Sequence, residues 1–330
     1  MSMIKRSNEI AIQKNVKMMV YGQAGMGKTT FALSAPKPLL LDFDNGVKRV
    51  NTAHLDDNVG IVQVSSWQDI LNLLNYNKKD LEEFDTIVVD TIGKMIDFII
   101  AYRCNGRNPQ IQDWGTINND FKWFTSSLSQ LNKNIVFVAH RDTRKEGEST
   151  VYIPALREKN YNNIVTDLDL LGYLEMRSEN GQQIRTITFD PTSRNDGKNT
   201  CQLPGCMQIP VILDVNGQPT APNNFIATQI LSRYQSMIAQ KEEKVKEYNK
   251  ALEEIKESVK LITDAKGANH FIEHIKDYAN MGNSIILHAR SLFTEKVSTL
   301  KLVYNKETKQ YEDQAIRRPT SSISYGSSQV

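Results

Sequence analysis

The sequence predicts an α/β fold in which a mostly parallel sheet carries a Gly-rich loop, followed by a C-terminal helical extension. Short apolar runs alternate with helical patterns from about residue 15 to residue 210, which is typical of strands joined by crossover helices. A Gly-rich phosphate-binding pattern directly follows the first apolar run. Beyond Pro222 the apolar residues recur at alternating spacings of three and four, which indicates long helices.

The expected core elements follow one another along the first two thirds of the chain. Strands are predicted at residues 16–21, 39–43, 60–64, 86–90 and 135–139, and helices at residues 28–34, 67–76, 92–102 and 121–131. Such an alternation predicts a sheet covered by helices on both faces. Loop signals mark residues 103–115, and an antiparallel pair at 168–176 and 183–189 is expected to finish the sheet.

The C-terminal third has a different pattern. A seam of apolar residues runs from Leu231 to Ile262 with Lys and Glu on the other faces, which predicts either a helix packed on its own domain or an intermolecular coiled coil. A second helical stretch is expected through about Leu302, and the polar end is expected to be disordered. The predicted organisation is an N-terminal segment at 1–14, a core domain at 15–222, a helical extension at 223–305 and a tail at 306–330.

Composition excludes several classes of protein. With 330 residues, 40% of them hydrophobic, the chain can form one sizeable core plus an appendage, or two domains. Lys and Arg total 40 against 38 Asp and Glu, so the overall charge does not decide whether nucleic acid is bound. Three cysteines are too few for a disulfide framework, and no apolar run is long enough to span a bilayer. We therefore expect a cytoplasmic protein that does not bind membranes.

The strongest motif is the P-loop pattern G-x4-G-K-T. Its glycines allow backbone turns that direct successive amides at phosphate oxygens. Lys28 can reach the β- and γ-phosphates, and the Thr29 hydroxyl can bind Mg²⁺. The sequence thus predicts that ATP and Mg²⁺ bind at Gly22, Gln23, Ala24, Gly25, Met26, Gly27, Lys28, Thr29 and Thr30.

Acidic and imidazole side chains end three of the predicted strands. Asp90 ends a buried strand, where its carboxylate is expected to hold Mg²⁺ together with Thr29. Asp42 and Asp44 end the second strand; Asp44 could orient the attacking water, or both acids could simply form the turn that follows. His140 ends the strand 135–139, where it could sense the γ-phosphate or make a structural hydrogen bond.

A stretch rich in cations starts directly after His140. Cations beside tyrosines suit single-stranded nucleic acid, because the charges follow phosphates and the rings stack on bases. Four acidic residues in the same stretch offset much of the charge, so a solvated surface loop is the alternative. The candidate DNA-binding residues are Arg141, Arg144, Lys145, Arg157 and Lys159.

Taken in order, these motifs resemble the RecA-like ATPases, and more narrowly the small phage-encoded members associated with single-strand annealing and recombination. Asp113-Trp114-Gly115, Val138-Ala139-His140 and Lys198-Asn199 support the resemblance, which covers about residues 14–210. It implies a RecA-like core, DNA-stimulated ATP hydrolysis, homo-oligomers on single-stranded DNA, and ATP held between neighbouring subunits.

The same resemblance implies roles for particular residues. Lys198 would be a cationic finger that reaches the γ-phosphate of a neighbouring subunit, and residues 103–115 and 141–163 would face DNA. The family usually has Glu where Asp44 stands, one methylene longer, so slow hydrolysis is expected here. The C-terminal helices lie outside the resemblance and could bind a protein partner.

Two other classes of function fit the same residues. A nucleotide-gated adaptor such as a helicase loader would bind its partner through the C-terminal helices and hydrolyse ATP weakly. A P-loop phosphotransferase would use Arg141, Arg144 and Lys145 as a lid. DNA-stimulated turnover would separate the recombination role from both alternatives.

The C-terminal segment also contains a match to an inverted zinc-protease pattern. His270, Glu273 and His274 have the H-x-x-E-H spacing. Phe271 and Ile275 continue an apolar stripe of the same helix, and no third protein ligand is evident in the sequence. This pattern therefore favours an ordinary surface helix.

Overall fold

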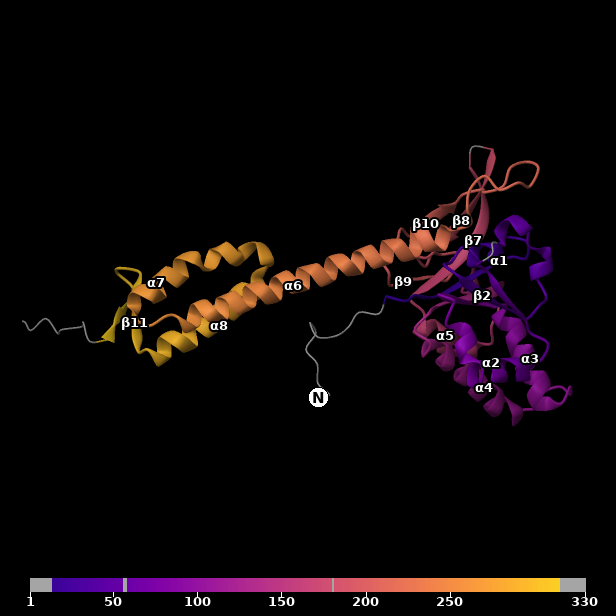
Figure 1. The fold of residues 1–330 in the computed structure, drawn as a ribbon, viewed down its shortest axis with the longest axis horizontal. Coiled ribbons are helices and arrows are strands. Elements are labelled where there is room, and N and C mark those ends of the chain that lie inside the picture. Colours follow the sequence, from indigo (N-terminus) through magenta and orange to yellow (C-terminus); the bar gives the residue numbers. More distant parts are fainter. Residues whose placement is uncertain (1–13, 56–57, 180, 315–330) are drawn as a thin grey trace, which may run out of the picture. The chain divides into compact units, whose positions relative to one another are not determined.

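The computed structural model describes residues 14–55, 58–179 and 181–314. The expectations for residues 1–13 and 315–330 lie outside the described residues. The chain divides between Ile238 and Ala239 into two compact units, which are described separately below (Figure 1). No helix of the described residues is long and apolar enough to cross a membrane.

The first unit is built on a mostly parallel sheet, as predicted. The strand order is β10-β8-β7-β1-β5-β4-β2-β3, in which the strands from β7 to β3 run parallel and β8 pairs antiparallel with both β7 and β10. The strands are β1 (Lys17–Gly22), β2 (Pro38–Asp42), β3 (Gly60–Gln63), β4 (Thr86–Asp90), β5 (Asn134–Glu146), β6 (Ser149–Pro154), β7 (Leu170–Glu179), β8 (Gln182–Thr188), β9 (Lys198–Asn199) and β10 (Cys206–Ile209). All residues of β2 and β4 are buried, as expected for central strands covered on both faces.

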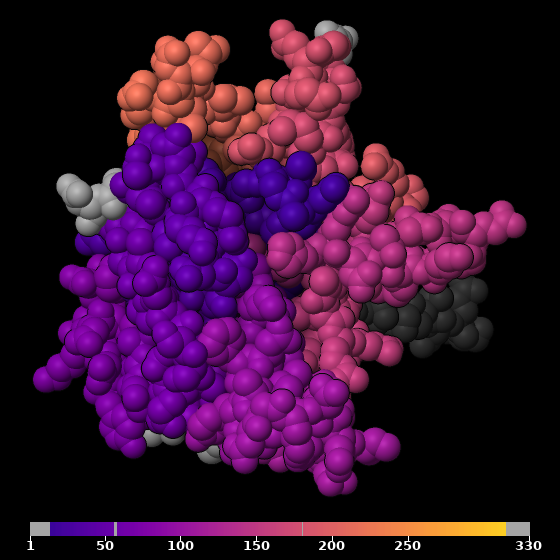
Figure 2. Space-filling model, turned by 90° about the vertical axis from the view of Figure 1, so that its right-hand side faces the viewer, coloured from indigo at the N-terminus to yellow at the C-terminus, as the bar shows by residue number. Residues whose placement is uncertain are grey.

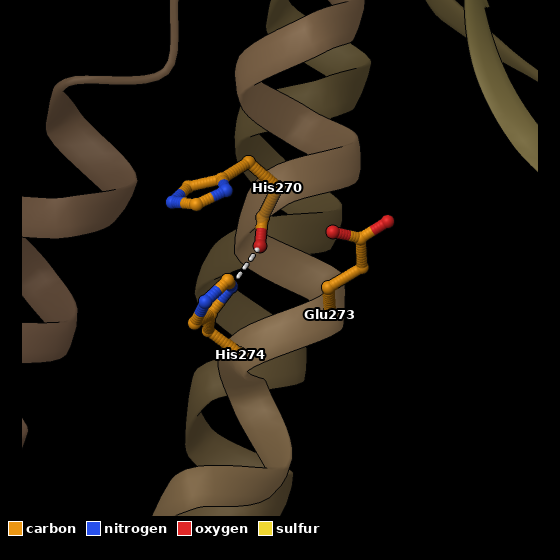
Figure 3. Close-up of side chains that lie close together, drawn as sticks. All are labelled: His270, Glu273 and His274. Atoms are coloured by element: carbon orange, nitrogen blue, oxygen red, sulfur yellow. Dashed lines mark hydrogen bonds between the residues drawn. The ribbon is translucent and has the colours of Figure 1, made fainter.

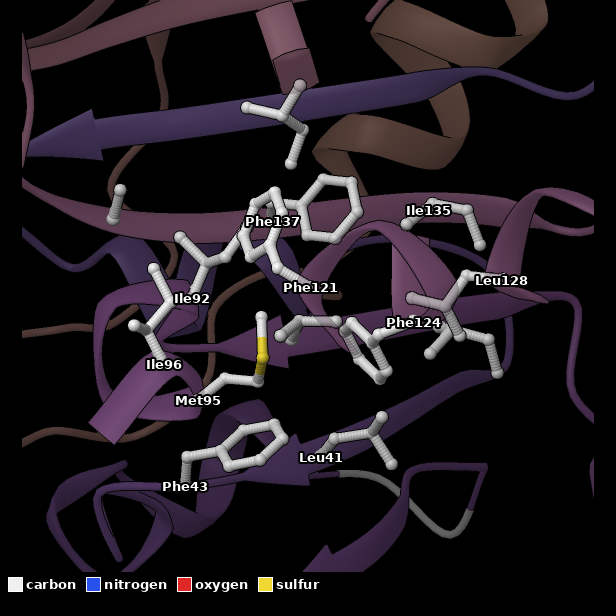
Figure 4. Packing of buried hydrophobic residues seen from close by; sticks show 14 of the residues in the cluster. Leu41, Phe43, Ile92, Met95, Ile96, Phe121, Phe124, Leu128, Ile135 and Phe137 are labelled. Carbon is white, nitrogen blue, oxygen red and sulfur yellow. The ribbon is translucent and has the colours of Figure 1, made fainter. Parts of the chain in front are cut away.

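Helices pack on each face of this sheet. The larger core cluster joins one face of the sheet to the helices α2 (Trp67–Asn75), α3 (Ile92–Cys104), α4 (Asp113–Ser129) and α5 (Glu158–Asp167). Figure 4 shows Met95 of α3 and Phe121 and Phe124 of α4 packed beside Phe137 of β5. Because β1, β4 and β5 are held between two apolar layers, their carboxyl ends form a fixed edge for a site.

The other face carries α1 (Lys28–Ala32) and the start of the helix that leads to the second unit. Phe225, Ile226, Ile230 and Leu231 are buried in the cluster of this face, and the rings of Phe31 and Phe225 are 5.8 Å apart. Phe225 precedes a π-helical turn (Ile226–Leu231) that continues into α6 (Ser232–Lys260). The core domain therefore extends past the predicted boundary at 222, because this segment completes its core.

The expected loop at 141–163 is instead an ordered hairpin followed by a helix. β5 continues beyond Ala139 to Glu146 and pairs with β6 in antiparallel register, from Arg141 opposite Pro154 to Glu146 opposite Ser149. α5 begins at Glu158. The predicted antiparallel pair is present as β7 and β8.

The second unit is helical, with a small hairpin. Residues Ala251, Ile255 and Val259 of α6 pack against α7 (Ala265–His274) and α8 (Asn283–Thr299), so this half of the predicted seam is buried within its own chain. β11 (Leu302–Asn305) pairs with β12 (Gln310–Asp313). Residues 306–314 are thus ordered, contrary to the expected disordered tail, because the Tyr311 ring packs 5.3 Å from that of Phe293.

Candidate nucleotide-binding site

The P-loop connects β1 to α1 at the carboxyl edge of the sheet. Gly25 and Gly27 have φ values of 80° and 78°, which glycine adopts without strain. Lys28 is buried, and its ammonium donates to the carbonyl of Gln23 at 2.9 Å. α1 spans only five residues, which is shorter than predicted. A loop of this kind can bind an anion through its backbone amides. Figure 2 shows the indigo region of this loop at the surface, bordered by purple and pink segments.

Thr29 and Asp90 meet at this edge. The Thr29 hydroxyl donates to Asp90 Oδ2 at 2.5 Å, although the two residues lie 61 positions apart. The pKa of Asp90 is raised to about 6, mainly by burial and also by the nearby Asp44 and Asp42, while the Thr29 hydrogen bond and Lys28 oppose the shift. A hydroxyl and a carboxylate are hard oxygen ligands that suit Mg²⁺. The donor set therefore fits the metal that the sequence predicts.

The two acids after β2 have different roles. Asp42 is buried, and its carboxylate accepts hydrogen bonds from the amides of Gly46 and Val47 at 2.9 and 3.0 Å, so it fixes the turn. Asp44 is partly exposed, and its carboxylate pairs with Arg49 at 3.3 Å. Burial lowers the pKa of Lys28, while Asp90 and Asp44 oppose that shift. Of these two acids, Asp44 is therefore the one that raises the pKa of the P-loop lysine.

His140 also lies at the P-loop. It is the β5 residue opposite Gly22, the last residue of β1, and its side chain is exposed. Burial lowers the pKa of His140, as do the positive charges of Lys28 and Lys94, whereas Asp44 raises it. The lowered pKa favours the neutral imidazole, and His140 interacts electrostatically with Lys28 and Asp44 of the same site.

The comparison with protein families agrees with this geometry. Residues 14–201 match the family model described as an AAA domain, which is more than half of the chain. The chain belongs to this AAA domain family. The AAA domain contains all the predicted site residues, from Gly22 to Lys198, and it is a P-loop NTPase domain.

Two individual proteins resemble parts of this AAA domain protein. The SPbeta prophage-derived uncharacterized protein YorG of Bacillus subtilis (strain 168) is 25% identical over 144 residues. This match covers 39% of the chain and 42% of that protein, so the chain spans less than half of this relative. A KaiC-like protein from Pyrococcus horikoshii OT3 aligns with 52% of the chain and 77% of its own, at 14% identity and a TM-score of 0.35.

Lys198 of the AAA domain does not join the P-loop residues. Its ammonium donates to the carbonyls of Val165 and Thr166, both at 2.9 Å, at the end of α5. Cations stabilise the exposed carbonyls of a helix C-terminus. The expected finger is therefore engaged within its own chain.

Most of the predicted DNA-binding cations also have partners within the chain. Arg141 donates to the Tyr173 hydroxyl at 3.2 Å and stacks on the Tyr152 ring at 4.4 Å. Arg144 pairs with Glu146 and Asp196, and Arg157 lies 3.4 Å from the Trp114 ring centroid. Lys145 and Lys159 are exposed. The hairpin thus presents Lys145 to solvent, and α5 presents Lys159.

The other segment expected to face DNA is held by ion pairs. Arg103 forms two hydrogen bonds with Asp120, and Arg107 forms two with Asp113. Ile111 lies between α3 and α4 and is 93% exposed. The segment is therefore an anchored connection that carries one exposed apolar side chain.

One residue beside the P-loop was not predicted. Arg185 lies on β8, and its guanidinium contacts Gly27 so closely that a Cβ at that position would be 3.0 Å from Nη1. No sequence signal marks it, because only the pairing of distant strands brings β8 to the loop.

The histidine pattern of the second unit lies on an exposed helix face. Ligand atoms of His270, Glu273 and His274 lie within 4.8 Å of one another, and His274 Nδ1 is 3.0 Å from the carbonyl oxygen of His270 (Figure 3). Phe271 of the same helix is buried in the core of the unit. This arrangement agrees with the surface helix expected from the sequence.

Proposed function

We propose that this protein binds ATP with Mg²⁺ and hydrolyses it. The observation that carries the proposal is the hydrogen bond between Thr29 and Asp90, beside the buried ammonium of Lys28. Bound Mg²⁺ would supply positive charge to the phosphates. Thr29 and Asp90 would hold the metal, Lys28 would exchange its bond to Gln23 for phosphate oxygens, and the loop amides would position the phosphates.

Asp44 is the residue we propose to orient the attacking water. It is partly exposed and acts electrostatically on both Lys28 and Asp90. Its pairing with Arg49 and its short side chain support slow turnover. His140 would report the γ-phosphate to the hairpin that starts at the next residue.

We further propose that the protein acts as a homo-oligomer on single-stranded DNA, in recombination, annealing or replication. The β5–β6 hairpin begins at the P-loop edge and carries the exposed Lys145, and Lys159 follows it on α5. The resemblance to phage RecA-like proteins and the prophage origin of one relative support this proposal.

A nucleotide-gated adaptor is the second candidate. The Asp44–Arg49 pair favours weak hydrolysis, and the second compact unit offers a separate surface for a protein partner. In that case ATP binding, rather than turnover, would be the signal.

The test compares ATP turnover with and without single-stranded DNA. The variant is Lys145→Ala with Lys159→Ala, and the control with equal charge loss is Lys78→Ala with Lys79→Ala, two exposed lysines remote from the hairpin in sequence. Arg141 and Arg144 are unsuitable, because their replacement would also loosen the hairpin.

If the hairpin contacts DNA, the first variant loses stimulation. The slope of log affinity against log salt should then fall by about 0.7 for each lost phosphate contact. The control should keep both properties. If single-stranded DNA does not change the ATP turnover of the parent, the proposed DNA role is rejected and the nucleotide-gated adaptor is favoured.

A further inference from the structure

We infer that Arg185 is a nucleotide-phosphate ligand supplied by the same chain, from the antiparallel part of the sheet. The inference rests on the proposed nucleotide binding and adds to it a residue that lies outside the P-loop motif. Three independent observations support it: contact with the loop, an unpaired charge, and a shared cavity.

The first observation is the contact with Gly27. A Cβ on Gly27 would lie 3.0 Å from Arg185 Nη1, 3.1 Å from Cζ and 3.4 Å from Nη2. The guanidinium therefore lies flat against the residue before the P-loop lysine. Because Gly27 belongs to the phosphate-binding loop, the donors of Arg185 are held beside the phosphate position.

The second observation is that the charge of Arg185 has no partner among the described residues. Its Nε atom is buried without a hydrogen bond, and no carboxylate pairs with the guanidinium in the described parts of the chain. Burial alone lowers the pKa of Arg185. Arg144 and Arg177, in contrast, both pair with carboxylates. Arg185 is half-buried, and a partly desolvated guanidinium without a carboxylate partner favours binding of an anion.

The third observation is a cavity of about 570 Å³ that Arg185 lines together with Thr30 and His54. Thr30 directly follows the two P-loop residues that face phosphate and metal. His54 Nδ1 is also buried without a partner. A volume of this size suits a small organic ligand. The cavity therefore places Arg185 between the phosphate loop and a space for the nucleoside.

Arg185 would face the non-reacting phosphates, because it lines the cavity proposed for the nucleoside, and the phosphates nearest the nucleoside are the non-reacting ones. A planar guanidinium can make two parallel hydrogen bonds to phosphate oxygens, which a lysine cannot. Arg185 should therefore contribute equally to the affinities for ATP and ADP.

The test measures the dissociation constants of ATP and ADP for the full chain, together with the thermal midpoint without nucleotide. Arg185→Met should lower both affinities by about ten- to a hundredfold, since charged hydrogen bonds are lost. Arg185→Lys should fall between this variant and the parent. Without nucleotide, Arg185→Met should unfold at the same or a higher temperature, because a half-buried charge without a carboxylate partner has been removed.

Arg194→Met is the control, because it removes an arginine whose side chain is exposed. The charge of Arg194 already has a carboxylate partner, since its Nη2 lies 3.6 Å from Glu175 Oε2. It should bind both nucleotides like the parent. If the parent binds nucleotide and Arg185→Met binds it equally well, Arg185 is no ligand, while the proposed function stands. A lower midpoint in Arg185→Met without nucleotide would assign Arg185 a packing role and overturn the inference. If the parent binds no nucleotide, the proposed function itself fails, and the inference fails with it.

Discussion

Asp90 is buried in the sheet, yet its carboxyl group must be ionised to bind a metal. Its pKa of about 6 in the folded protein exceeds the ordinary 3.8, because burial disfavours the charge. The folded protein thus binds more protons than the unfolded protein between about pH 4 and pH 6. Stability without nucleotide should therefore fall as pH rises through this window.

Asp90→Asn should remove this dependence, because the amide does not titrate and still accepts a hydrogen bond from Thr29. At pH 7 the variant should be more stable than the parent by up to about 3 kcal/mol, while Mg²⁺-dependent turnover is lost. Urea unfolding of both proteins from pH 4 to pH 7 measures the difference. If the stability of the parent and that of Asp90→Asn change with pH in the same way, the pKa of Asp90 is not raised in the folded protein.

Replacing Asp42 and replacing Asp44 should have different effects on the free energy of unfolding. Asp42→Ala leaves the buried amides of Gly46 and Val47 without an acceptor, and should reduce the free energy of unfolding by about 1–3 kcal/mol. Asp44→Ala, at a partly exposed site, should change it by less than about 0.5 kcal/mol but lower ATP turnover. Chemical denaturation and turnover assays of the two variants separate the roles, and equal stability losses would contradict them.

Single-residue roles could be predicted where they depend on local sequence. The P-loop, Asp90 and His140 lie at the ends of apolar strands, and the parallel sheet brings such ends to one edge. Lys198 and Arg185 depend instead on contacts between distant segments. The resemblance gave Lys198 a role at a neighbouring subunit, whereas the structure places it at the end of α5.

Elements were predictable where one or both faces are buried. β1, β2 and β4 are continuous apolar runs, and all three were expected from the sequence. The second half of β5 was expected to be a loop because residues 140–146 are polar and mostly exposed, so no alternation of apolar residues marks the strand. Its order comes from pairing with β6 and from the contacts of Arg141 and Arg144.

The segment after residue 222 is the element whose role most differs from prediction. A fragment of residues 1–238 should fold cooperatively, whereas a fragment of residues 1–222 lacks four buried side chains (Phe225, Ile226, Ile230 and Leu231). Burial of each contributes about 1.5–3 kcal/mol, so the shorter fragment should be unfolded or melt far below the longer one. Thermal melts followed by circular dichroism provide the test; equal midpoints would place the segment outside the core.

At the scale of the whole molecule, the chain joins an AAA domain to a second, helical unit with its own core. The sequence predicted both parts and their order. It did not predict where the core of the AAA domain ends. A helix has the same apolar pattern whether it packs on a sheet or on other helices. The helical unit lies outside the matched family region.

The central claim is that the P-loop edge of the sheet binds ATP with Mg²⁺. Isothermal titration of ATP into the full chain, with and without Mg²⁺, tests it most directly. The parent and the exposed-site control Lys122→Ala should bind ATP, more tightly with Mg²⁺, whereas Lys28→Ala should lose binding and keep the thermal midpoint of the parent. Undiminished ATP affinity in a folded Lys28→Ala protein would contradict the claim.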